Sequence, residues 1–451
     1  MATKRKNSLK LHSFYRGKIQ VFPKCRIRNY QDFAIWYTPG VAEPCKRIKE
    51  ISELVYEYTG KGNTIAVVTD GTRVLGLGDI GPEAALPVME GKALLFKYLG
   101  GVDAVPLCLN TKDANEFVKI IEVLQPSFGG INLEDIEQPK CFYILEKLRK
   151  ECSIPVWHDD QQGTATVILA GLINALKIVN KKIEHVKVAM LGAGAGNIAT
   201  ARLLFSAGVN PENVVMVDSK GTLHRGRKEL KDTHPQKWQL CLETNKEQVK
   251  GNSAEAIKDT DVLIALSKPG PGVVKKEWIK TMANNAIVFA CANPVPEIWP
   301  REAKDGGARI VATGRSDFPN QLNNSLGFPG IFRGVLDVQA KTITDKMCLT
   351  AAYELAGYAE KKGLNEDYII PTMDDWEVYV LEAVAVGQEA IREGLAGKNL
   401  SRKKLYQEAY KKIKEAREIT QLLMKEKYIN DYTTPQPSFS PRGRRIKMRG
   451  H

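Results

Sequence analysis

Short apolar runs alternate with segments of helical periodicity along the first half of the chain. Runs rich in β-branched residues predict strands, and segments whose apolar positions recur every three or four residues predict helices. The predicted strands are 63–69, 102–109, 127–132 and 154–157, and the predicted helices are 84–99, 112–123, 138–149 and 163–179. This alternation is typical of a parallel sheet with helical crossovers. Asp70-Gly71 is a turn signal, and we expect 74–77 to pair with 63–69 as a hairpin.

A second series of the same kind follows. A strand at 186–191 leads into a glycine-rich turn and then into a helix that ends near Ala207. Further strands are predicted at 213–217, 262–265, 286–290 and 309–312, an order that resembles a doubly wound domain. From Thr342 the pattern is mostly helical, with a charged amphipathic helix over 403–427. The proline-rich stretch 435–441 begins a tail that we expect to be disordered.

The glycine-rich turn has the setting of a dinucleotide-binding fingerprint, because it follows a strand and opens a helix. Gly192 is expected to make the tight turn and Gly194 to let the backbone approach a pyrophosphate at the helix N-terminus. Gly196 completes the run, but the third glycine of the G-x-G-x-x-G pattern is replaced by Asn197. The alternative is a glycine-rich turn without a ligand.

Asp218 supports the ligand-binding interpretation. It ends the next predicted strand, 22 residues beyond Gly196, where an acid binds the ribose 2′-hydroxyl of NAD. Ser219 and Lys220 follow directly and are suited to a 2′-phosphate. The choice between NAD and NADP stays open, and Asp218 favours NAD.

Two acidic pairs each end a predicted strand of the first series. Glu134-Asp135 follows one strand, and Asp159-Asp160 follows the next. The carboxyl ends of parallel strands meet at one crevice, where four carboxylates repel each other without a cation. Oxygen ligands of this kind suit Mg²⁺ or Mn²⁺, and no Cys/His spacing indicates zinc. Helix caps or solvated turns are the alternative interpretation of the same pairs.

The net charge of +13 comes from 65 basic and 52 acidic residues, and it belongs to the two ends of the chain. Residues 1–28 hold nine basic residues and 432–451 hold five, with no acid in either segment. Without these 14, the body has 51 basic against 52 acidic residues, so its charge does not predict nucleic-acid binding. Solvated tails are favoured over polyanion-binding ends.

The cysteines and the apolar segments indicate a cytoplasmic protein. None of the eight cysteines forms a C-x-x-C pair, which is typical of reduced, intracellular thiols. No apolar segment of a signal peptide follows the charged N-terminus. The apolar stretch 164–179 is shorter than the roughly 20 residues that span a bilayer, so we expect a buried helix there.

Five longer motifs resemble those of malic enzymes, most closely the smaller, prokaryotic-type form. They are YTPGVA at 37–42, the run VVTDGTRVLGLGDIGPEAALPVMEGKALLFK at 67–97, INLED at 131–135, HDDQQGTA at 158–165 and NQLNNSLGFPGIFRG at 320–334. The resemblance extends from about Phe14 to about Gly397, in the same order. It implies oxidative decarboxylation of (S)-malate to pyruvate and CO₂ with NAD or NADP and Mg²⁺ or Mn²⁺, by a homodimer or higher homo-oligomer.

The resemblance also implies roles for individual residues. The metal ligands are Glu134, Asp135 and Asp160, and the catalytic residues are Tyr37, Lys92 and Asp159, which helps the lysine. Arg73 grips a substrate carboxylate, and Asn293 and Asn324 line the pocket shared by substrate and nicotinamide.

Structural roles remain open for several of these residues. Tyr37 can be a packed aromatic, Lys92 a lysine that extends its stem along a helix, and Asp159 a helix cap. Arg73 can be a residue of an exposed turn. Asn293 and Asn324 can serve as turn or cap residues.

The implied architecture is α/β with two domains: a parallel-sheet substrate and metal domain over 1–157 and a Rossmann-like NAD(P)-binding domain over 158–397. A helical C-terminus with a basic tail covers 398–451. Gln161-Gln162 resembles the subset of the family that also decarboxylates oxaloacetate. The alternatives are a malolactic-type enzyme, which converts malate to lactate, and a non-catalytic polyanion-binding protein.

Overall fold

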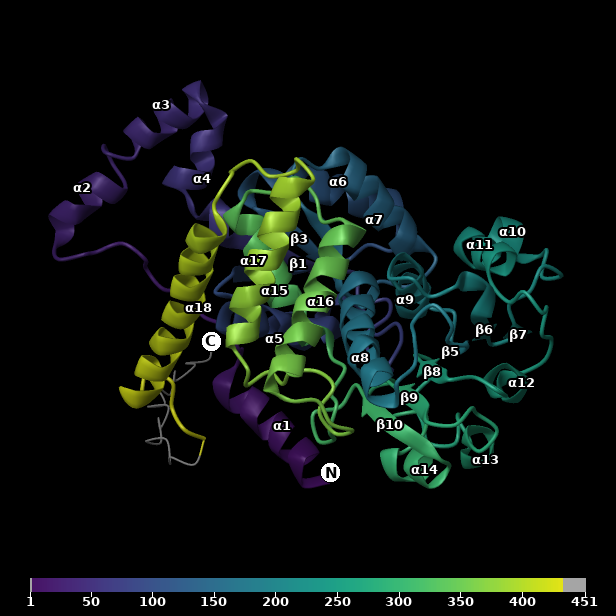
Figure 1. The fold of residues 1–451 in the computed structure, drawn as a ribbon. Helices are drawn as coiled ribbons and strands as arrows, with labels where there is room; N and C mark the ends of the chain where they lie inside the picture. Colours follow the sequence, from purple (N-terminus) through teal and green to yellow (C-terminus); the bar gives the residue numbers. More distant parts are fainter. Residues whose placement is uncertain (1, 433–451) are drawn as a thin grey trace, which may run out of the picture.

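The computed structural model describes residues 2–432 and contains one parallel and one mostly parallel sheet, both flanked by helices (Figure 1). The first sheet has the order β2-β1-β3-β4, and all of its pairings are parallel. Its strands are β1 (Thr64–Thr69), β2 (Asp103–Cys108), β3 (Gly130–Leu133) and β4 (Val156–His158). The connecting helices are α5 (Pro82–Gly100), α6 (Ala114–Leu124) and α7 (Lys140–Glu151). The predicted 435–441 tail lies outside the described residues.

The predicted hairpin partner of β1 is wrong. Residues 74–77 form no strand, and Val74 makes only an isolated bridge with Gly78. Both edges of β1 are taken by the parallel strands β2 and β3, so a third partner has no edge to pair with. The segment is instead a loop that folds back, with the amides of Ile80 and Gly81 donating to the carbonyl of Gly71.

The second sheet has the order β10-β9-β8-β5-β6-β7 and is Rossmann-like. Its strands are β5 (Val188–Leu191), β6 (Val214–Asp218), β7 (Gly221–Thr222), β8 (Val262–Ala265), β9 (Ala286–Ala290) and β10 (Ala308–Thr313). Its helices are α9 (Ala195–Ser206), α10 (Leu230–Thr233), α11 (Pro235–Glu243), α12 (Ser253–Ile257), α13 (Lys276–Ile279) and α14 (Pro300–Asp305). Only β7 is antiparallel, and its two residues were too short a signal for the sequence to predict.

One long apolar helix connects the two sheets. A short π-helix, η5 (Asp159–Gly163), follows β4 and continues directly into α8 (Thr164–Val179). Among the described residues, the span 159–179 is the one segment apolar and long enough to cross a membrane, but 78% of its most apolar window is buried inside the fold. It is therefore a core helix, as its sequence predicted.

The C-terminal helices return to the first sheet. They are α15 (Phe328–Asp337), α16 (Asp345–Lys362), α17 (Glu377–Arg392) and α18 (Arg402–Lys425). The ring of Phe96 on α5 lies 4.5 Å from that of Phe328 and 5.2 Å from that of Phe332 on α15. The C-terminal region thus packs against the helix that carries Lys92.

Residues 17–58, which we call the arm, leave the body of the molecule. The arm contains α2 (Phe33–Trp36), α3 (Ala42–Glu50) and α4 (Val55–Tyr58), and it follows the N-terminal helix α1 (Ala2–Tyr15). In Figure 1, α2 and α3 stand apart from both sheets. Phe33, Ile35 and Trp36 remain about half exposed, which is unusual for residues of this size.

Candidate active site

Three carboxylates meet at the carboxyl ends of β3 and β4. Leu133 pairs with His158 at the ends of these strands, so the residues that follow both strands emerge side by side. One oxygen each of Glu134, Asp135 and Asp160 lies within 4.8 Å of the other two. The structure therefore brings together the three residues that the sequence singled out as metal ligands.

The conformation of Asp135 suits a cation. Its φ of +54° lies in the left-handed region, which a non-glycine residue adopts at a cost of about 1–3 kcal/mol. Its amide donates to Oδ2 of Asp160 over 2.8 Å, which fixes the two acids relative to each other. Its buried Oδ2 accepts no hydrogen bond within residues 2–432. A buried carboxylate oxygen without a donor, beside two further carboxylates, fits a hard divalent cation.

Burial and mutual repulsion make this cluster hard to ionise on its own. Burial, followed by the charge of Asp160, raises the pKa of Asp135 to about 8. Burial also raises the pKa of Glu134 well above its usual value, although Lys92 opposes the shift. A divalent cation would remove this repulsion.

Lys92 lies at the edge of the carboxylate cluster, on the buried face of α5. Its ammonium donates to Oδ2 of Asp159 and lies 3.1 Å from Oε1 of Glu134. Burial disfavours the charged amine, but the charges of Asp159 and Glu134 together outweigh it and raise the pKa of Lys92. In this arrangement the lysine is held as an ammonium.

Two aromatic residues that sequence reasoning missed hold this pair in place. The indole Nε1 of Trp157 donates to Oδ1 of Asp159 over 3.2 Å. The Lys92 ammonium lies 4.5 Å from the centre of the Phe328 ring, within reach of a cation–π attraction. Phe328 belongs to the motif at 320–334, and Trp157 directly precedes the HDDQQ motif, but the sequence did not indicate that either would contact the pair.

Arg73 lies on the folded-back loop beside the carboxylate cluster. Its amide donates to the carbonyl of Asp135 over 3.0 Å, and its exposed guanidinium donates to the carbonyl of Leu75. This loop position is compatible with a guanidinium that reaches a substrate carboxylate.

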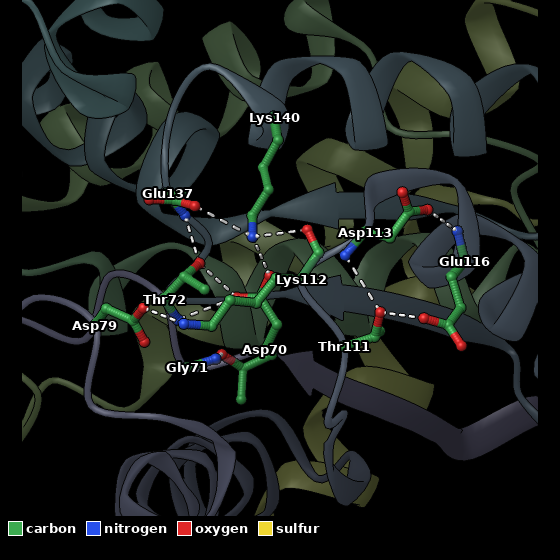
Figure 2. Close-up of polar contacts among 11 residues, drawn as sticks. Asp70, Gly71, Thr72, Asp79, Thr111, Lys112, Asp113, Glu116, Glu137 and Lys140 are labelled. Atoms are coloured by element: carbon green, nitrogen blue, oxygen red, sulfur yellow. Dashed lines mark hydrogen bonds and ion pairs between the residues drawn. The ribbon is translucent and has the colours of Figure 1, made fainter.

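A buried polar network anchors the start of this loop (Figure 2). Oδ1 of Asp70 accepts from the hydroxyl of Thr72 over 2.6 Å, and its Oδ2 lies 2.7 Å from the ammonium of Lys140. The amide of Glu137 donates to the Thr72 hydroxyl over 3.0 Å. The network ties the end of β1 to the segment between Asp135 and α7.

The two asparagines occupy different surroundings. Asn324 begins η7 (Asn324–Leu326), but the cap of this 3-10 helix is Asn323, whose side chain accepts from the amide of Ser325. A β-carbon built on Gly163 would lie 2.0 Å from Oδ1 of Asp159 and 3.2 Å from Cβ of Asn324, which places Asn324 beside Asp159. Asn293 lies on a loop of the second sheet that meets the Arg73 loop, because its carbonyl would be 2.7 Å from a β-carbon on Gly76.

Tyr37 is not brought to this cluster. It directly follows α2 in the arm, and 72% of its surface is exposed. Within the described residues no hydrogen bond of the phenol is found, and α2 stands apart from α5 in Figure 1. The alternative role as a packed aromatic is also not supported in the single chain, given this exposure.

The glycine turn has the conformation that a dinucleotide site needs. Gly192 has a φ of +92°, and a β-carbon there would lie 2.4 Å from the carbonyl of Leu266. A β-carbon on Gly194 would meet nothing within 4 Å, so the turn is open on that side. Asn197, which stands at the third glycine position, donates its amide to the carbonyls of Leu191 and Gly192 over 2.8 Å each. These two hydrogen bonds stabilise the turn.

Gly196 lies where the glycine turn approaches the carboxylate cluster. It lies in the first turn of α9, and a β-carbon there would be 3.1 Å from the carbonyl oxygen of Asp160. Asp218 ends β6 as predicted, but its carboxylate forms ion pairs with Arg227 and Lys237. These partners lie 9 and 19 residues further along the chain, and no local pattern indicates them.

Comparison with known families decides the assignment. The family model "Malic enzyme, N-terminal domain" matches residues 16–149, and "Malic enzyme, NAD binding domain" matches residues 161–391. The chain belongs to the malic enzyme family. The resemblance found in the sequence motifs is therefore confirmed, as is the two-domain α/β fold.

Curated members of the family cover most of the chain. The bifunctional malic/malolactic enzyme of Bacillus subtilis is 49% identical over 87% of this chain and 94% of its own length. The NAD-dependent malic enzyme of Geobacillus stearothermophilus is 49% identical over 85% and 78%. The NADP-dependent malic enzyme of Halomonas elongata is 42% identical over 84% and 92%.

Solved malic enzymes share the whole architecture. The crystal structure of the Entamoeba histolytica malic enzyme has a TM-score of 0.93 and 50% identity, covering 95% of this chain and 90% of that one. The malic enzyme of Pyrococcus horikoshii has a TM-score of 0.88 and 50% identity, covering 94% and 98%. The chain is an NAD(P)-dependent malic enzyme by family, and the family reaction is the oxidative decarboxylation of malate.

Proposed function

We propose that this chain converts (S)-malate to pyruvate and CO₂ at the cluster formed by Glu134, Asp135 and Asp160. The observation that carries this proposal is the convergence of these three carboxylates beside the buried Lys92–Asp159 pair. The test is an assay with malate, Mn²⁺ and each nicotinamide cofactor, in which the product is identified. Pyruvate and reduced cofactor in equal amounts are the expected result.

The three carboxylates would hold Mg²⁺ or Mn²⁺, as the free oxygen of Asp135 and the all-oxygen ligand set suggest. When bound, such a cation polarises the hydroxyl and then the carbonyl oxygen at C2 of the substrate. Arg73 would orient a substrate carboxylate from the neighbouring loop, and Asn293 and Asn324 would line the pocket towards the nicotinamide. Binding at several points fixes the substrate for hydride transfer.

Lys92 would accept the proton of the C2 hydroxyl, and Asp159 would receive the proton that Lys92 must first release. The support is the direct hydrogen bond between the two side chains. Both groups are buried, and Phe328 contacts the ammonium while Trp157 donates to the carboxylate, which holds the two side chains in position. A positioned general base of this kind is worth about 10²–10⁴-fold in rate.

After decarboxylation, the enol of pyruvate must be protonated at C3, and we assign this step to Tyr37. In a single chain the phenol lies on the arm, away from Lys92. We therefore propose that the arm crosses to a second copy of the chain and supplies Tyr37 to that copy's site. The half-exposed Phe33, Ile35 and Trp36 are the apolar surface that such a crossing would bury. The active form is then a homodimer or a higher assembly of dimers.

Mixing two inactive variants tests this exchange. Tyr37→Phe and Lys92→Ala chains are refolded or coexpressed together. Random pairing makes about half of the dimers mixed. If the tyrosine acts across the dimer, each mixed dimer holds one intact site out of two, so about a quarter of wild-type activity returns. The control mixes Tyr37→Phe with the double variant, which leaves no intact site. No recovery in the first mixture would overturn the exchange and place Tyr37 with its own chain.

Release of lactate is the second candidate outcome. The Bacillus subtilis relative is a bifunctional malic/malolactic enzyme. A malolactic reaction reoxidises the cofactor, so absorbance at 340 nm would not rise while malate is consumed. Assay of lactate beside pyruvate distinguishes the two reactions. Added oxaloacetate in the same assay tests the decarboxylation suggested by Gln161-Gln162.

A further inference from the structure

The carboxylate of Asp218 at the end of β6 is enclosed by donors from three directions. Its Oδ1 accepts from the backbone amide of Lys220 over 2.9 Å and from Nη1 of Arg227 over 3.1 Å. Its Oδ2 accepts from Nη2 of Arg227 over 3.2 Å and from the ammonium of Lys237 over 3.4 Å. Only 7% of its side chain remains exposed.

These four donors leave Asp218 little capacity for a ribose. A carboxylate oxygen offers about two acceptor positions, and each oxygen of Asp218 already has two donors. Burial opposes ionisation, but Arg227 and Lys237 hold the pKa of Asp218 below its usual value, so the group is an anchored anion. A ribose 2′-hydroxyl could donate to Asp218 only by displacing one of these cations. The basis on which the sequence favoured NAD is therefore weakened.

Positive charge exceeds negative charge around the carboxylate of Asp218. Arg227 also pairs with Glu229, but Lys237 has no second acidic partner in the part of the chain that the structure describes. The Lys220 side chain is exposed and forms no ion pair there. His224 and His234 lie in the same field: burial lowers the pKa of each, and neighbouring lysines lower it further. Lys220 itself lies in the turn between β6 and β7.

We propose that Lys220, Arg227 and Lys237 form the binding site for the 2′-phosphate of NADP, and that the enzyme prefers NADP to NAD. The inference rests on the proposed function, since it assumes that a nicotinamide dinucleotide binds the turn 192–196. In a Rossmann-like domain the end of the second strand lies at the adenosine ribose, and an arginine there accommodates a 2′-phosphate. Asp218 then orients two of the cations instead of contacting the ribose.

The donors of Arg227 are consistent with this role. A guanidinium has five N–H groups. In the described residues, Nε donates to Glu229, Nη1 to Asp218 and Thr222, and Nη2 to Asp218. One N–H of Nη2 is left for a ligand. A phosphate that accepts from it and from the Lys220 ammonium would gain charge-assisted bonds, which are stronger than neutral ones.

Binding of adenosine fragments to the full-length enzyme tests the preference without turnover. Isothermal titration compares adenosine 2′,5′-bisphosphate with ADP, which lacks the 2′-phosphate. We expect the bisphosphate to bind at least about tenfold more tightly, as for a phosphate held by charged donors. Lys220→Ala should reduce that ratio, and Lys280→Ala, at an exposed lysine that follows α13, should not. Lys220 is exposed, so its substitution does not endanger the fold.

Arg227→Ala is the second variant, because it frees two acceptor positions on Asp218. The ratio of kcat/KM for NADP over NAD should fall, and the KM for NAD should decrease. Equal binding of the two fragments by the wild type, or a ratio that neither variant changes, would overturn the inference while leaving malate oxidation intact. Binding of neither fragment, together with no turnover with either cofactor, would overturn the proposed function itself.

Discussion

The ammonium of Lys92 lies 3.1 Å from Oε1 of Glu134 while it donates to Asp159, so one amine contacts both a member of the three-carboxylate cluster and an acid outside that cluster. The group proposed to move the substrate proton is thereby fixed to the cluster that is proposed to hold the substrate. The residues proposed for proton transfer and for metal binding lie on or directly after α5, β3 and η5.

Replacement of Lys92 should lower kcat far more than it weakens nucleotide binding. Lys92→Ala is expected to lower kcat by about 10²–10⁴-fold, as for loss of a general base, while the affinity for nucleotide stays within a few-fold. The measurement is steady-state kinetics beside titration of the cofactor. Lys97→Ala, on the same helix but in a half-exposed pair with Asp103, is the control and should be nearly silent. Near-normal turnover of Lys92→Ala would contradict the assignment.

Asp135→Asn should have opposite effects with and without metal. Without a cation, the raised pKa of Asp135 costs the wild type folding free energy at neutral pH, and asparagine removes that cost, so the variant should melt at a higher temperature than the wild type. Addition of Mn²⁺ should stabilise the wild type by mass action and the variant far less. Thermal melting in EDTA and in graded Mn²⁺ measures both effects. A wild-type melting temperature that does not respond to Mn²⁺ would argue against the metal site.

Gly196→Ala should disturb the site without unfolding the protein. Alanine favours a helix by about 1 kcal/mol over glycine, but its β-carbon would press on the carbonyl of Asp160. Small displacements of reacting groups are costly, so we expect kcat to fall about tenfold while the melting temperature changes little. Gly357→Ala in α16, where a β-carbon would meet nothing within 4 Å, is the matched control. Equal activities of Gly196→Ala and Gly357→Ala would contradict the idea that the glycine turn positions the carboxylate cluster.

Glu382→Gln should stabilise the enzyme in a pH-dependent manner. Glu382 on α17 is fully buried, and neither of its carboxyl oxygens has a hydrogen-bond partner within residues 2–432. Burial, with a smaller contribution from Glu354, raises its pKa well above the usual value. The folded state therefore binds the proton more tightly than the unfolded state, and stability is lost as pH rises above the unfolded pKa of about 4.3.

The variant lacks this titration. Its extra free energy of unfolding over the wild type should therefore be absent near pH 4 and should rise with pH. The total rise should be about 1.4 kcal/mol for each unit by which the folded-state pKa of Glu382 exceeds the unfolded one. Urea unfolding between pH 5 and pH 8 measures it. Glu377→Gln, at the exposed start of the same helix, should show no such trend. A constant difference between wild type and Glu382→Gln across this range would contradict the shift.

Local patterns predicted most of the fold, because the spacing of apolar residues along the chain differs between buried strands and amphipathic helices. The bounds of β8 and β9 agree with the prediction, and the acids after β3 and β4 converge because parallel strands share one carboxyl edge. The hairpin after Asp70 was wrong because a local turn signal does not tell whether the edges of β1 are already occupied. That information lies in β2 and β3, more than 30 residues away in the chain.

Side-chain partners were predicted less well than backbone positions. The sequence placed Asp218 correctly at the end of β6, but its ion pairs depend on how the segment after β7 folds back. Trp157 and Phe328 could not be recognised as neighbours of Asp159 and Lys92 for the same reason. These contacts join distant segments, and no local pattern encodes them.

The exposed arm has a consequence for how activity depends on abundance. If each site takes its acid from a neighbouring chain, an isolated chain is inert whatever the supply of malate or cofactor. When the chain concentration is well below the dissociation constant of the dimer, enzyme activity then grows with the square of that concentration. Above the dissociation constant, activity becomes proportional to the concentration. Dilution, rather than any effector, would be the simplest way to silence such an enzyme.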